Sequence, residues 1–260
     1  MSVLDSIIEG VRLDEEARRL SKSELADRIS SAPSPRSALK KLATKDLSII
    51  AEIKRSSPSK GELSEIAKPG LLAATYEKNG ASVISVLTER HRFKGSLQDF
   101  SEVRAIVDLP MLRKDFMVSE YLIQESRAYG ADLVLLIVAA LDDHQLRDFH
   151  KLSEELGMDV LVEIHDETEL ERALAIAPKI IGVNSRNLKT LEVDTSSFTR
   201  LIPLIPKSVI KVAESGMSEV ADILAARSTG ADAVLVGEAL VRSQDPGRTL
   251  RNFLESASSS

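Results

Sequence analysis

Charged side chains of both signs stand close together in residues 49–61 (IIAEIKRSSPSKG). Glu52 and Lys54 follow an apolar run that predicts a buried strand, and residues two apart in a strand share a face. Ser57 lies in the Ser-, Pro- and Gly-containing segment that follows, which predicts a flexible polar loop. A carboxylate beside an amine at a strand end is suited to acid–base chemistry. The alternative is a surface ion pair of little energetic consequence.

Polar side chains end several further apolar runs in the same way. The residues are Lys114, Glu163, Asn184, Arg186, Glu214 and Ser215. Gly216 follows the last of these runs and Gly237 follows one further apolar run, at positions where backbone N–H groups can face an anion. The alternative for both glycines is that they only turn the chain. Recurrence of charge at strand ends favours a reaction site with an anionic ligand.

No metal-binding pattern accompanies these residues. His91, His144 and His150 fall in loop or helix segments without i, i+4 pairing, and we expect His165 to point away from the site. The sequence has no Asp-rich cluster for Mg²⁺ and no Walker motif. We therefore expect lysines and glutamates to act here without a metal or a cofactor.

The elements that must position these residues alternate between strand and helix from residue 48 onward. The predicted strands are 48–53, 82–87, 110–114, 132–137, 159–164, 180–184, 209–214 and 232–236. The predicted helices are 71–78, 97–107, 120–129, 143–156, 167–175, 196–204, 219–227 and 246–254. Such alternation requires parallel strands joined by crossovers.

Eight strand–helix units predict an α/β fold, a closed (β/α)8 TIM barrel. An open doubly wound sheet is the alternative, but its G-x-G-x-x-G loop is absent. Gly80, Gly130 and Gly230 begin a repeated Gly-Ala step, with a degraded copy at Ala177, and predict helix C-caps. We expect one barrel domain over residues 1–260, with residues 1–45 as an N-terminal helical extension packing on the barrel.

Composition excludes several classes of protein. The net charge of −6 argues against a nucleic-acid binder. The longest apolar run is too short to span a membrane, and the first residues lack the basic and apolar parts of a signal peptide. The absence of Cys suits a reducing compartment. We expect a cytoplasmic protein, with no nucleic acid or membrane as a partner.

Seven blocks of the sequence resemble the indole-3-glycerol phosphate synthase family, over essentially the whole chain. The most specific is IAEIKRSSPS (50–59). The others are LRKDF (112–116), LLIVAAL (135–141), LVEIH (161–165), GVNSRNL (182–188), VAESG (212–216) and VGEAL (236–240). The resemblance implies that 1-(2-carboxyphenylamino)-1-deoxyribulose 5-phosphate is cyclised, decarboxylated and dehydrated to indole-3-glycerol phosphate in tryptophan biosynthesis.

The resemblance also implies residue roles. Lys114 would be the general acid at the keto oxygen, Glu163 the general base, and Lys54 a second acid or an electrostatic partner. Glu52 and Asn184 would fix geometry, and Glu214 and Ser215 would complete the catalytic ring. The expected substrate-binding residues are Ser57, Arg186 for the carboxylate, Gly216, Gly237 and Glu238 near the phosphate, and Phe93, Phe116, Leu188 and Val236 around the aromatic ring. Glu238 stands where some members have Ser or Thr.

A lysine acid works best with its pKa lowered toward about 7–8. A second lysine nearby and partial burial would both push the pKa of Lys114 in that direction, while the glutamates oppose them. Among the alternatives, a phosphoribosylanthranilate isomerase-like barrel would need a Cys that is absent. A Schiff-base aldolase and a non-catalytic phosphate-binding scaffold remain open. We expect a monomer and leave association with other pathway enzymes open.

Overall fold

Parallel strands close into a barrel in the computed structural model, which describes residues 2–188 and 190–258. Around the barrel the described strands follow the order β1-β10-β9-β8-β7-β6-β5-β4. They are β1 (Ser48–Ile53), β4 (Val83–Leu87), β5 (Met111–Lys114), β6 (Leu133–Ile137), β7 (Asp159–Ile164), β8 (Ile180–Asn184), β9 (Ile210–Glu214) and β10 (Ala233–Val236). The predicted (β/α)8 barrel is confirmed, and each predicted strand begins and ends within one residue of the observed one.

The strands are apolar runs because both of their faces are covered. Every residue of β4, β6 and β8 is buried. The barrel closes where β1 pairs with β10 on one side, Ser48 opposite Ala233, and with β4 on the other, Ile50 opposite Val83. All eight strands run in the same direction, so their carboxyl ends meet at one rim.

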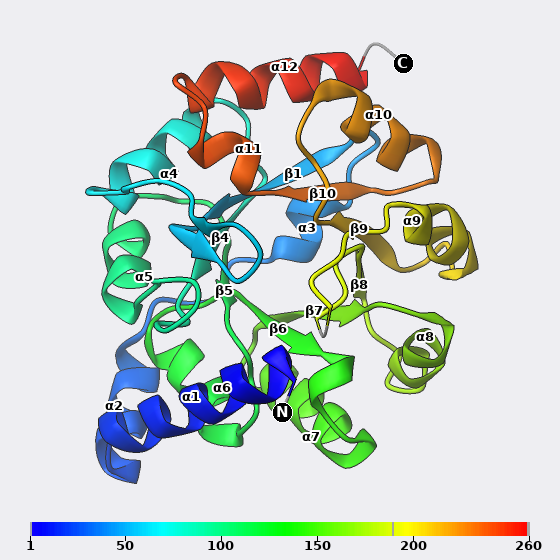
Figure 1. Cartoon of the computed structure of the whole chain (residues 1–260). Helices are drawn as coiled ribbons and strands as arrows, with labels where there is room; N and C mark the ends of the chain where they lie inside the picture. Colours follow the sequence, from blue (N-terminus) through cyan, green and yellow to red (C-terminus); the bar gives the residue numbers. More distant parts are fainter. Residues whose placement is uncertain (1, 189, 259–260) are drawn as a thin grey trace.

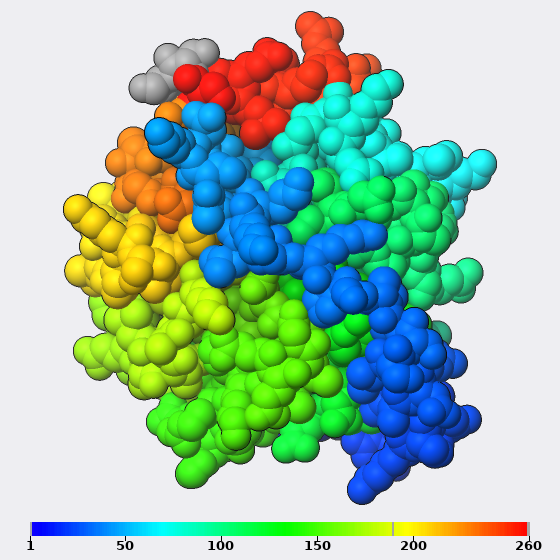
Figure 2. Space-filling model, turned by 180° about the vertical axis from the view of Figure 1, so that it is seen from behind, coloured from blue at the N-terminus to red at the C-terminus, as the bar shows by residue number. Residues whose placement is uncertain are grey.

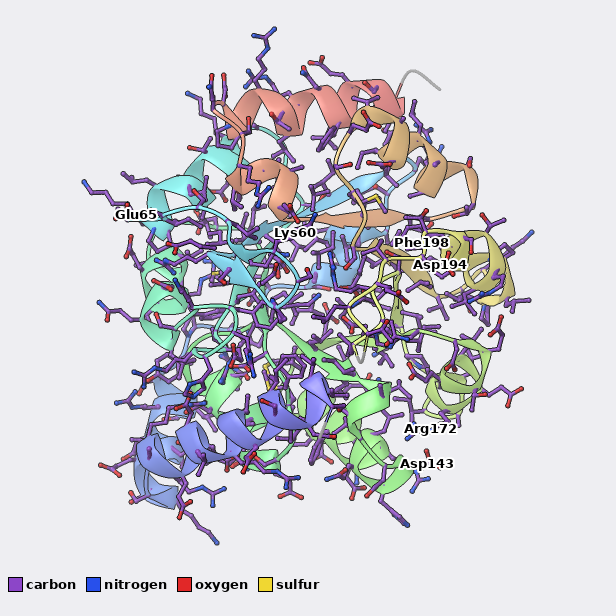
Figure 3. The ribbon with its side chains drawn as sticks, viewed as in Figure 1. Lys60, Glu65, Asp143, Arg172, Asp194 and Phe198 are labelled. Carbon is purple, nitrogen blue, oxygen red and sulfur yellow. The ribbon has the colours of Figure 1, made fainter. Side chains whose placement is uncertain are left out.

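Helices surround the barrel (Figure 1). They are α4 (Pro69–Lys78), α5 (Leu97–Arg104), α6 (Glu120–Ala128), α7 (Asp143–Glu155), α8 (Glu167–Leu174), α9 (Ser196–Leu201), α10 (Val220–Ser228) and α12 (Pro246–Ser258). The sequence did not separate α11 (Glu238–Val241) or the 3₁₀ turns η1 (Val138–Ala140) and η2 (Ile202–Leu204). Neighbouring helices are linked by ion pairs such as that between Arg172 of α8 and Asp143 of α7, 2.7 Å apart (Figure 3).

Local signals explain where many of these helices begin and end. The side chains of Ser96, Ser119, Asp142 and Asp166 accept backbone N–H groups of the first turn, as N-caps do. The repeated glycines lie just beyond helix ends with φ between 82° and 98°. The left-handed backbone there costs glycine little, so the repeat is structural. Ala177, in the degraded copy, adopts φ 50° without that advantage.

Three helices precede the barrel and lie at different ends of it. They are α1 (Val3–Arg18), α2 (Lys22–Ser31) and α3 (Ala38–Leu42). Figure 2 shows the segment around α3 crossing the rear face, where the strands begin. There the Asp159 carboxylate, at the start of β7, accepts the Leu39 N–H at 2.9 Å. Helix α1 lies at the opposite rim (Figure 1). None of the helices in the described ranges is long and apolar enough to cross a membrane.

The segment predicted as an irregular loop after β1 contains a small antiparallel hairpin, β2 (Ser56–Ser57) with β3 (Gly61–Glu62). Two side chains support it: Ser56 Oγ donates to the Gly61 carbonyl, and Ser57 Oγ accepts the Lys60 N–H. Gly61 turns the chain with φ 66°. These local hydrogen bonds give order to a stretch whose composition predicts a loop.

Candidate active site

A cavity of about 440 Å³ opens at the carboxyl ends of the strands. Every predicted catalytic residue, and every predicted substrate-binding residue except Val236, lines it. The fifteen residues are Glu52, Lys54, Ser57, Phe93, Lys114, Phe116, Glu163, Asn184, Arg186, Leu188, Glu214, Ser215, Gly216, Gly237 and Glu238. They come from loops and strands up to 186 positions apart, Glu52 to Glu238, and barrel closure brings them to one rim.

Four charged side chains from alternate barrel strands form the floor of the cavity. Lys114 Nζ lies 2.5 Å from Glu214 Oε2 and 3.6 Å from Glu163 Oε2. Glu52 accepts from Lys54 at 2.9 Å and from the Ser85 hydroxyl at 3.2 Å. Alternate strands of such a barrel contribute side chains to the same layer, which explains why these residues meet.

The glutamates, and not burial, decide the direction in which the pKa of Lys114 is shifted. Burial acts to lower the pKa of Lys114, but the charges of Glu214, Glu163 and Glu52 outweigh it and raise the pKa above its ordinary value. The second lysine, Lys54, pairs with Glu52 at 2.9 Å. Lys114 is therefore fully protonated at neutral pH.

The carboxylates of this layer differ from one another. Burial, with the charges of Glu163 and Glu52, raises the pKa of Glu214 to about 7 despite its bond to Lys114. Burial would also raise the pKa of Glu52, but Lys54 and Lys114 together hold it below its ordinary value. Carboxylates with different pKa values in one cavity are typical of acid–base sites.

Two glycines make room for these carboxylates. A Cβ atom on Gly182 would come within 2.0 Å of Glu214 Oε1, and one on Gly237 within 2.7 Å of Glu52 Oε1. The sequence predicted only an anion-binding use for Gly237 and none for Gly182. Because glycine has no side chain, each carboxylate can lie close to the neighbouring strand.

The loop after β9 turns sharply at the cavity wall. Ser215 and Gly216 both adopt the left-handed backbone, with φ 68° and 75°. For a residue with a Cβ this conformation costs about 1–2 kcal/mol, and such strain is concentrated at functional sites. Across the wall, Glu238 pairs with Arg242 at 3.4 Å. Arg242, which also lines the cavity, was not predicted.

Arg186 connects two loops over the cavity. Its Nη1 donates to Ser59 Oγ at 2.9 Å and to the Leu191 carbonyl at 3.1 Å, so it joins the loop after β8 to the hairpin after β1. Burial lowers the pKa of Arg186 below its ordinary value. The Asn184 side chain accepts the Arg186 N–H at 3.0 Å and thereby shapes the same turn.

An apolar wall faces the charged layer. The rings of Phe93 and Phe116 lie 6.3 Å apart at 38°, beside Leu188. The prediction that Val236 joins this wall is wrong, because Val236 is fully buried away from the cavity and Leu235 lines it instead. Alternation along β10 could have shown this, since Leu235 and Gly237 share a face.

Helix α1 adds residues that the sequence analysis missed. Val3, Leu4 and Ile7 from its first turns line the cavity. Their spacing predicts an amphipathic helix, but it cannot tell which part of the barrel the helix covers. The helix thus provides part of the cavity wall.

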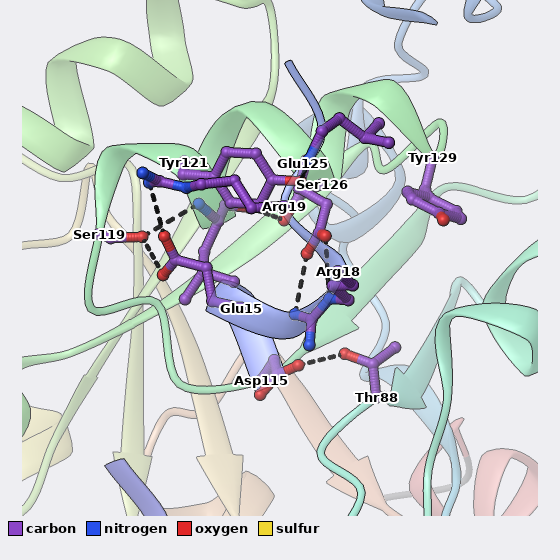
Figure 4. A network of polar contacts seen from close by, with 12 residues as sticks. Glu15, Arg18, Arg19, Thr88, Asp115, Ser119, Tyr121, Glu125, Ser126 and Tyr129 are labelled. Atoms are coloured by element: carbon purple, nitrogen blue, oxygen red, sulfur yellow. Dashed lines mark hydrogen bonds and ion pairs between the residues drawn. The ribbon is translucent and has the colours of Figure 1, made fainter. Parts of the chain in front are cut away.

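The other end of α1 is anchored in a buried ionic network (Figure 4). Arg18 donates two hydrogen bonds to Glu125 of α6, at 2.9 and 3.0 Å. Glu125 also pairs with the fully buried Arg113, which precedes Lys114 on β5. Arg113 Nε donates to Thr88 Oγ1, which donates in turn to Asp115. The anchor of α1 and the strand carrying Lys114 therefore share one network.

His165 does not line the cavity, but its ring contacts a carboxylate that does. Its Nε2 lies 3.4 Å from Glu163 Oε1, and its Nδ1 lies 2.9 Å from Glu169 Oε2. Residues 163 and 165 share a face because they are two apart at the end of β7. Within residues 2–188 and 190–258, no group of three or more His, Cys, Asp or Glu is placed to hold a metal ion.

Comparison with known proteins gives a consistent result. The family model described as indole-3-glycerol phosphate synthase matches residues 4–253. A protein of that name from Streptomyces griseus is 55% identical over 248 residues, covering 95% of this chain and 92% of its own. Another from Micrococcus luteus is 54% identical over 260 residues, covering 97% of each chain.

Solved structures with little sequence identity share the barrel. 3-Hexulose-6-phosphate synthase is 18% identical, with a TM-score of 0.62 over 81% of this chain and 99% of its own. Thiamine phosphate pyrophosphorylase from Pyrococcus furiosus is 13% identical, with a TM-score of 0.63 over 86% and 98%. These likenesses support the fold alone.

Proposed function

Because this chain belongs to the indole-3-glycerol phosphate synthase family, we propose that the fifteen cavity residues carry out the family's reaction. That reaction serves tryptophan biosynthesis and acts on a small phosphorylated substrate, 1-(2-carboxyphenylamino)-1-deoxyribulose 5-phosphate. The ring carbon bearing the carboxylate bonds to the keto carbon, CO₂ leaves, and water is lost to give indole-3-glycerol phosphate. The contact of Lys114 with two carboxylates at the cavity floor carries the assignment of roles.

Lys114 is the general acid for ring closure. Its raised pKa means that it enters the reaction protonated, next to the position where the keto oxygen gains negative charge. As the new carbon–carbon bond forms, the ammonium gives its proton to that oxygen, which becomes a hydroxyl. The leaving CO₂ returns its bonding electrons to the ring. Glu214, whose pKa is about 7, is hydrogen-bonded to the same nitrogen and can share protons with it.

Dehydration needs a second acid and a base. The hydroxyl leaves as water with a proton from an acid, and the closing ring loses a carbon-bound proton. We assign the base to Glu163, whose Oε2 faces Lys114 at 3.6 Å. Lys54, held by Glu52 at 2.9 Å, is the second cation available to the leaving hydroxyl. Asn184 shapes the adjoining turn.

Binding groups lie on opposite walls. The planar guanidinium of Arg186 can grip the substrate carboxylate with two parallel hydrogen bonds. The left-handed turn at Ser215 and Gly216, with Gly237, presents backbone N–H groups for the phosphate. Ser57 and Glu238 flank this phosphate site, and Arg242 balances the charge of Glu238. Phe93, Phe116 and Leu188 enclose the aromatic ring.

Replacement of Lys114 tests the central assignment. Lys114→Ala removes the proton donor, so kcat should fall by about 10²- to 10⁴-fold, measured by fluorescence of the indole product. Circular dichroism should show an intact fold. Lys151→Ala, an exposed lysine on α7, is the matched control and should keep full activity. Turnover near the wild-type rate in Lys114→Ala would disprove the role.

Arg186→Ala should act mainly on binding. Loss of the carboxylate partner should raise KM by about 10- to 100-fold, corresponding to a charged hydrogen bond of about 1.5–3 kcal/mol, with a smaller effect on kcat. Initial rates over a range of substrate concentrations separate the two. An unchanged KM would mean that the carboxylate binds elsewhere.

The remaining assignments concern the protein as a whole. We propose that residues 1–45 and the barrel form one domain, because α1 lines the cavity and α3 contacts the strand starts. We propose a monomer working in the cytoplasm, and leave association with other pathway enzymes open. Sedimentation equilibrium across a range of concentrations tests the monomer.

A further inference from the structure

Three largely buried side chains form a row that ends at Glu163. Glu169 Oε2, from the first turn of α8, accepts the His165 backbone N–H at 2.8 Å and faces His165 Nδ1 at 2.9 Å. Glu169 therefore holds both the backbone and the ring of His165. Its other nitrogen, Nε2, lies 3.4 Å from Glu163 Oε1, and the His165 side chain is only 13% exposed.

Both facing atoms are otherwise unsatisfied. Among the described residues, Glu163 Oε1 and His165 Nε2 are buried and have no hydrogen-bond partner of good geometry. A buried polar group without a partner costs about 1–3 kcal/mol, so packing alone gives no reason for this arrangement. A small rotation of the Glu163 carboxylate would bring the two atoms into a charge-assisted hydrogen bond.

We propose that His165 is a positioning residue for the reaction: held by Glu169, it orients Glu163, the base, from behind by offering Nε2 to the second carboxylate oxygen. This inference rests on the role of Glu163 given under the proposed function. His165 does not line the cavity and does not touch substrate, so its effect passes through Glu163.

The charges around the row explain why such support is needed. Glu163 lies in a layer with two further carboxylates, Glu52 and Glu214, whose negative charges repel its own. Lys114 faces one Glu163 oxygen, and the His165 ring faces the other. The groups facing His165 are Glu163 from β7, Glu169 from α8 and, further away, Glu214 from β9. Burial lowers the pKa of His165, but these carboxylates outweigh burial and raise it above its ordinary value.

A pair of substitutions separates geometry from charge. His165→Asn places its amide near the Nδ1 position, so it keeps the Glu169 contact and loses Glu163. We expect kcat to fall by about 10- to 100-fold with KM little changed, and the acid limb of the kcat/KM profile to move up by about one pH unit. His165→Gln reaches Glu163 with an uncharged amide. It should recover most of kcat while the acid limb stays shifted.

Glu169→Gln should move the acid limb in the same direction by less, since it weakens the charge on the ring without removing it. His150→Asn is the matched control: His150 is a buried histidine on α7 that faces Glu154, outside the cavity. It should leave the profile unchanged. A His165→Asn profile superimposable on that of the wild type would overturn the proposal. Equal losses of kcat in both His165 variants without a pH shift would also overturn it.

A second readout does not depend on activity. The chain has four histidines, so the His165 imidazole signal can be assigned by its loss in His165→Asn and titrated by NMR. Glu163→Gln should lower the pKa of His165, and an unchanged titration would overturn the proposal. The turnover rate of Glu163→Gln separates the test of Glu163 as the base from the test of His165 as a positioning residue. Wild-type turnover in that variant would contradict the assigned base, whereas an inactive Glu163→Gln with normal His165 variants would contradict only the positioning role.

Discussion

Individual carboxylates in the cavity owe their properties to their neighbours. Glu214 and Glu52 both end buried strand segments and both face lysines, yet the pKa of Glu214 is raised and that of Glu52 is lowered. Glu52 has Lys54 at 2.9 Å as well as the field of Lys114, whereas Glu214 shares Lys114 with Glu163. Two lysines act on Glu52 and one acts on Glu214, and this difference decides which of the two carboxylates holds a proton near neutral pH.

The raised pKa of Glu214 predicts a pH effect on stability. Between its ordinary pKa of 4.5 and about 7, folded protein keeps a proton that the unfolded chain has released. Its contribution to the free energy of unfolding therefore falls as pH rises through this window. Glu214→Gln removes that titration, so wild type should lose stability relative to the variant between pH 5 and 8 in urea unfolding. Glu155→Gln, an exposed site on α7, should run parallel to wild type. Parallel curves for Glu214→Gln would contradict the raised pKa.

At the scale of secondary-structure elements, α1 connects stability to the cavity. Its first turns line the cavity and its last turn binds Glu125. A helix of this length gains most of its stability from tertiary contacts, so the ionic anchor helps to keep the apolar turns in place.

Arg18→Gln should weaken that anchor. Glu125 keeps its pairing with Arg113, so the loss is limited to the Arg18 bonds, about 1–3 kcal/mol in the free energy of unfolding. KM should rise as the cavity wall loosens, with kcat less affected. Thermal unfolding and steady-state rates check both. Arg12→Gln, at an exposed position on the same helix, is the control. Lower stability with a normal KM would show that the anchor and the cavity wall are independent.

In the whole molecule, the two ends of the barrel have different tasks. The carboxyl ends of the strands carry the charged layer and the cavity, and the amino ends are covered by the segment around α3 (Figure 2). In barrels of this type, residues at the amino end serve stability. Asp159 belongs to this end, where its carboxylate accepts from Leu39 N–H and the Ser37 hydroxyl.

Asp159→Ala should therefore separate stability from activity. Loss of the two hydrogen bonds should lower the free energy of unfolding by about 1–3 kcal/mol, with kcat and KM near wild type because the cavity lies at the other end. Asp148→Ala, exposed on α7, should change neither property. A large fall in kcat in Asp159→Ala at full folding would show that the two ends are linked.

The sequence by itself determined the strand and helix pattern, the barrel and the charged residues at the strand ends. Apolar runs, N-cap residues and C-cap glycines are local signals, and the common direction of the strands sends every strand end to one rim. Glu52, Lys114, Glu163 and Glu214 could be grouped for that reason. Family resemblance supplied their expected roles, because strand position alone gives no chemistry.

Only the tertiary structure decided which groups touch. The pKa of Lys114 depends on the distances to carboxylates that lie 49 to 100 positions away in sequence. The row from Glu169 to Glu163 exists because α8 packs its first turn against the end of β7. Helix α1 covers the cavity because Arg18 binds a network that other elements build. Electrostatic and packing energies depend on the distance between groups in space, and closure of the barrel sets that distance.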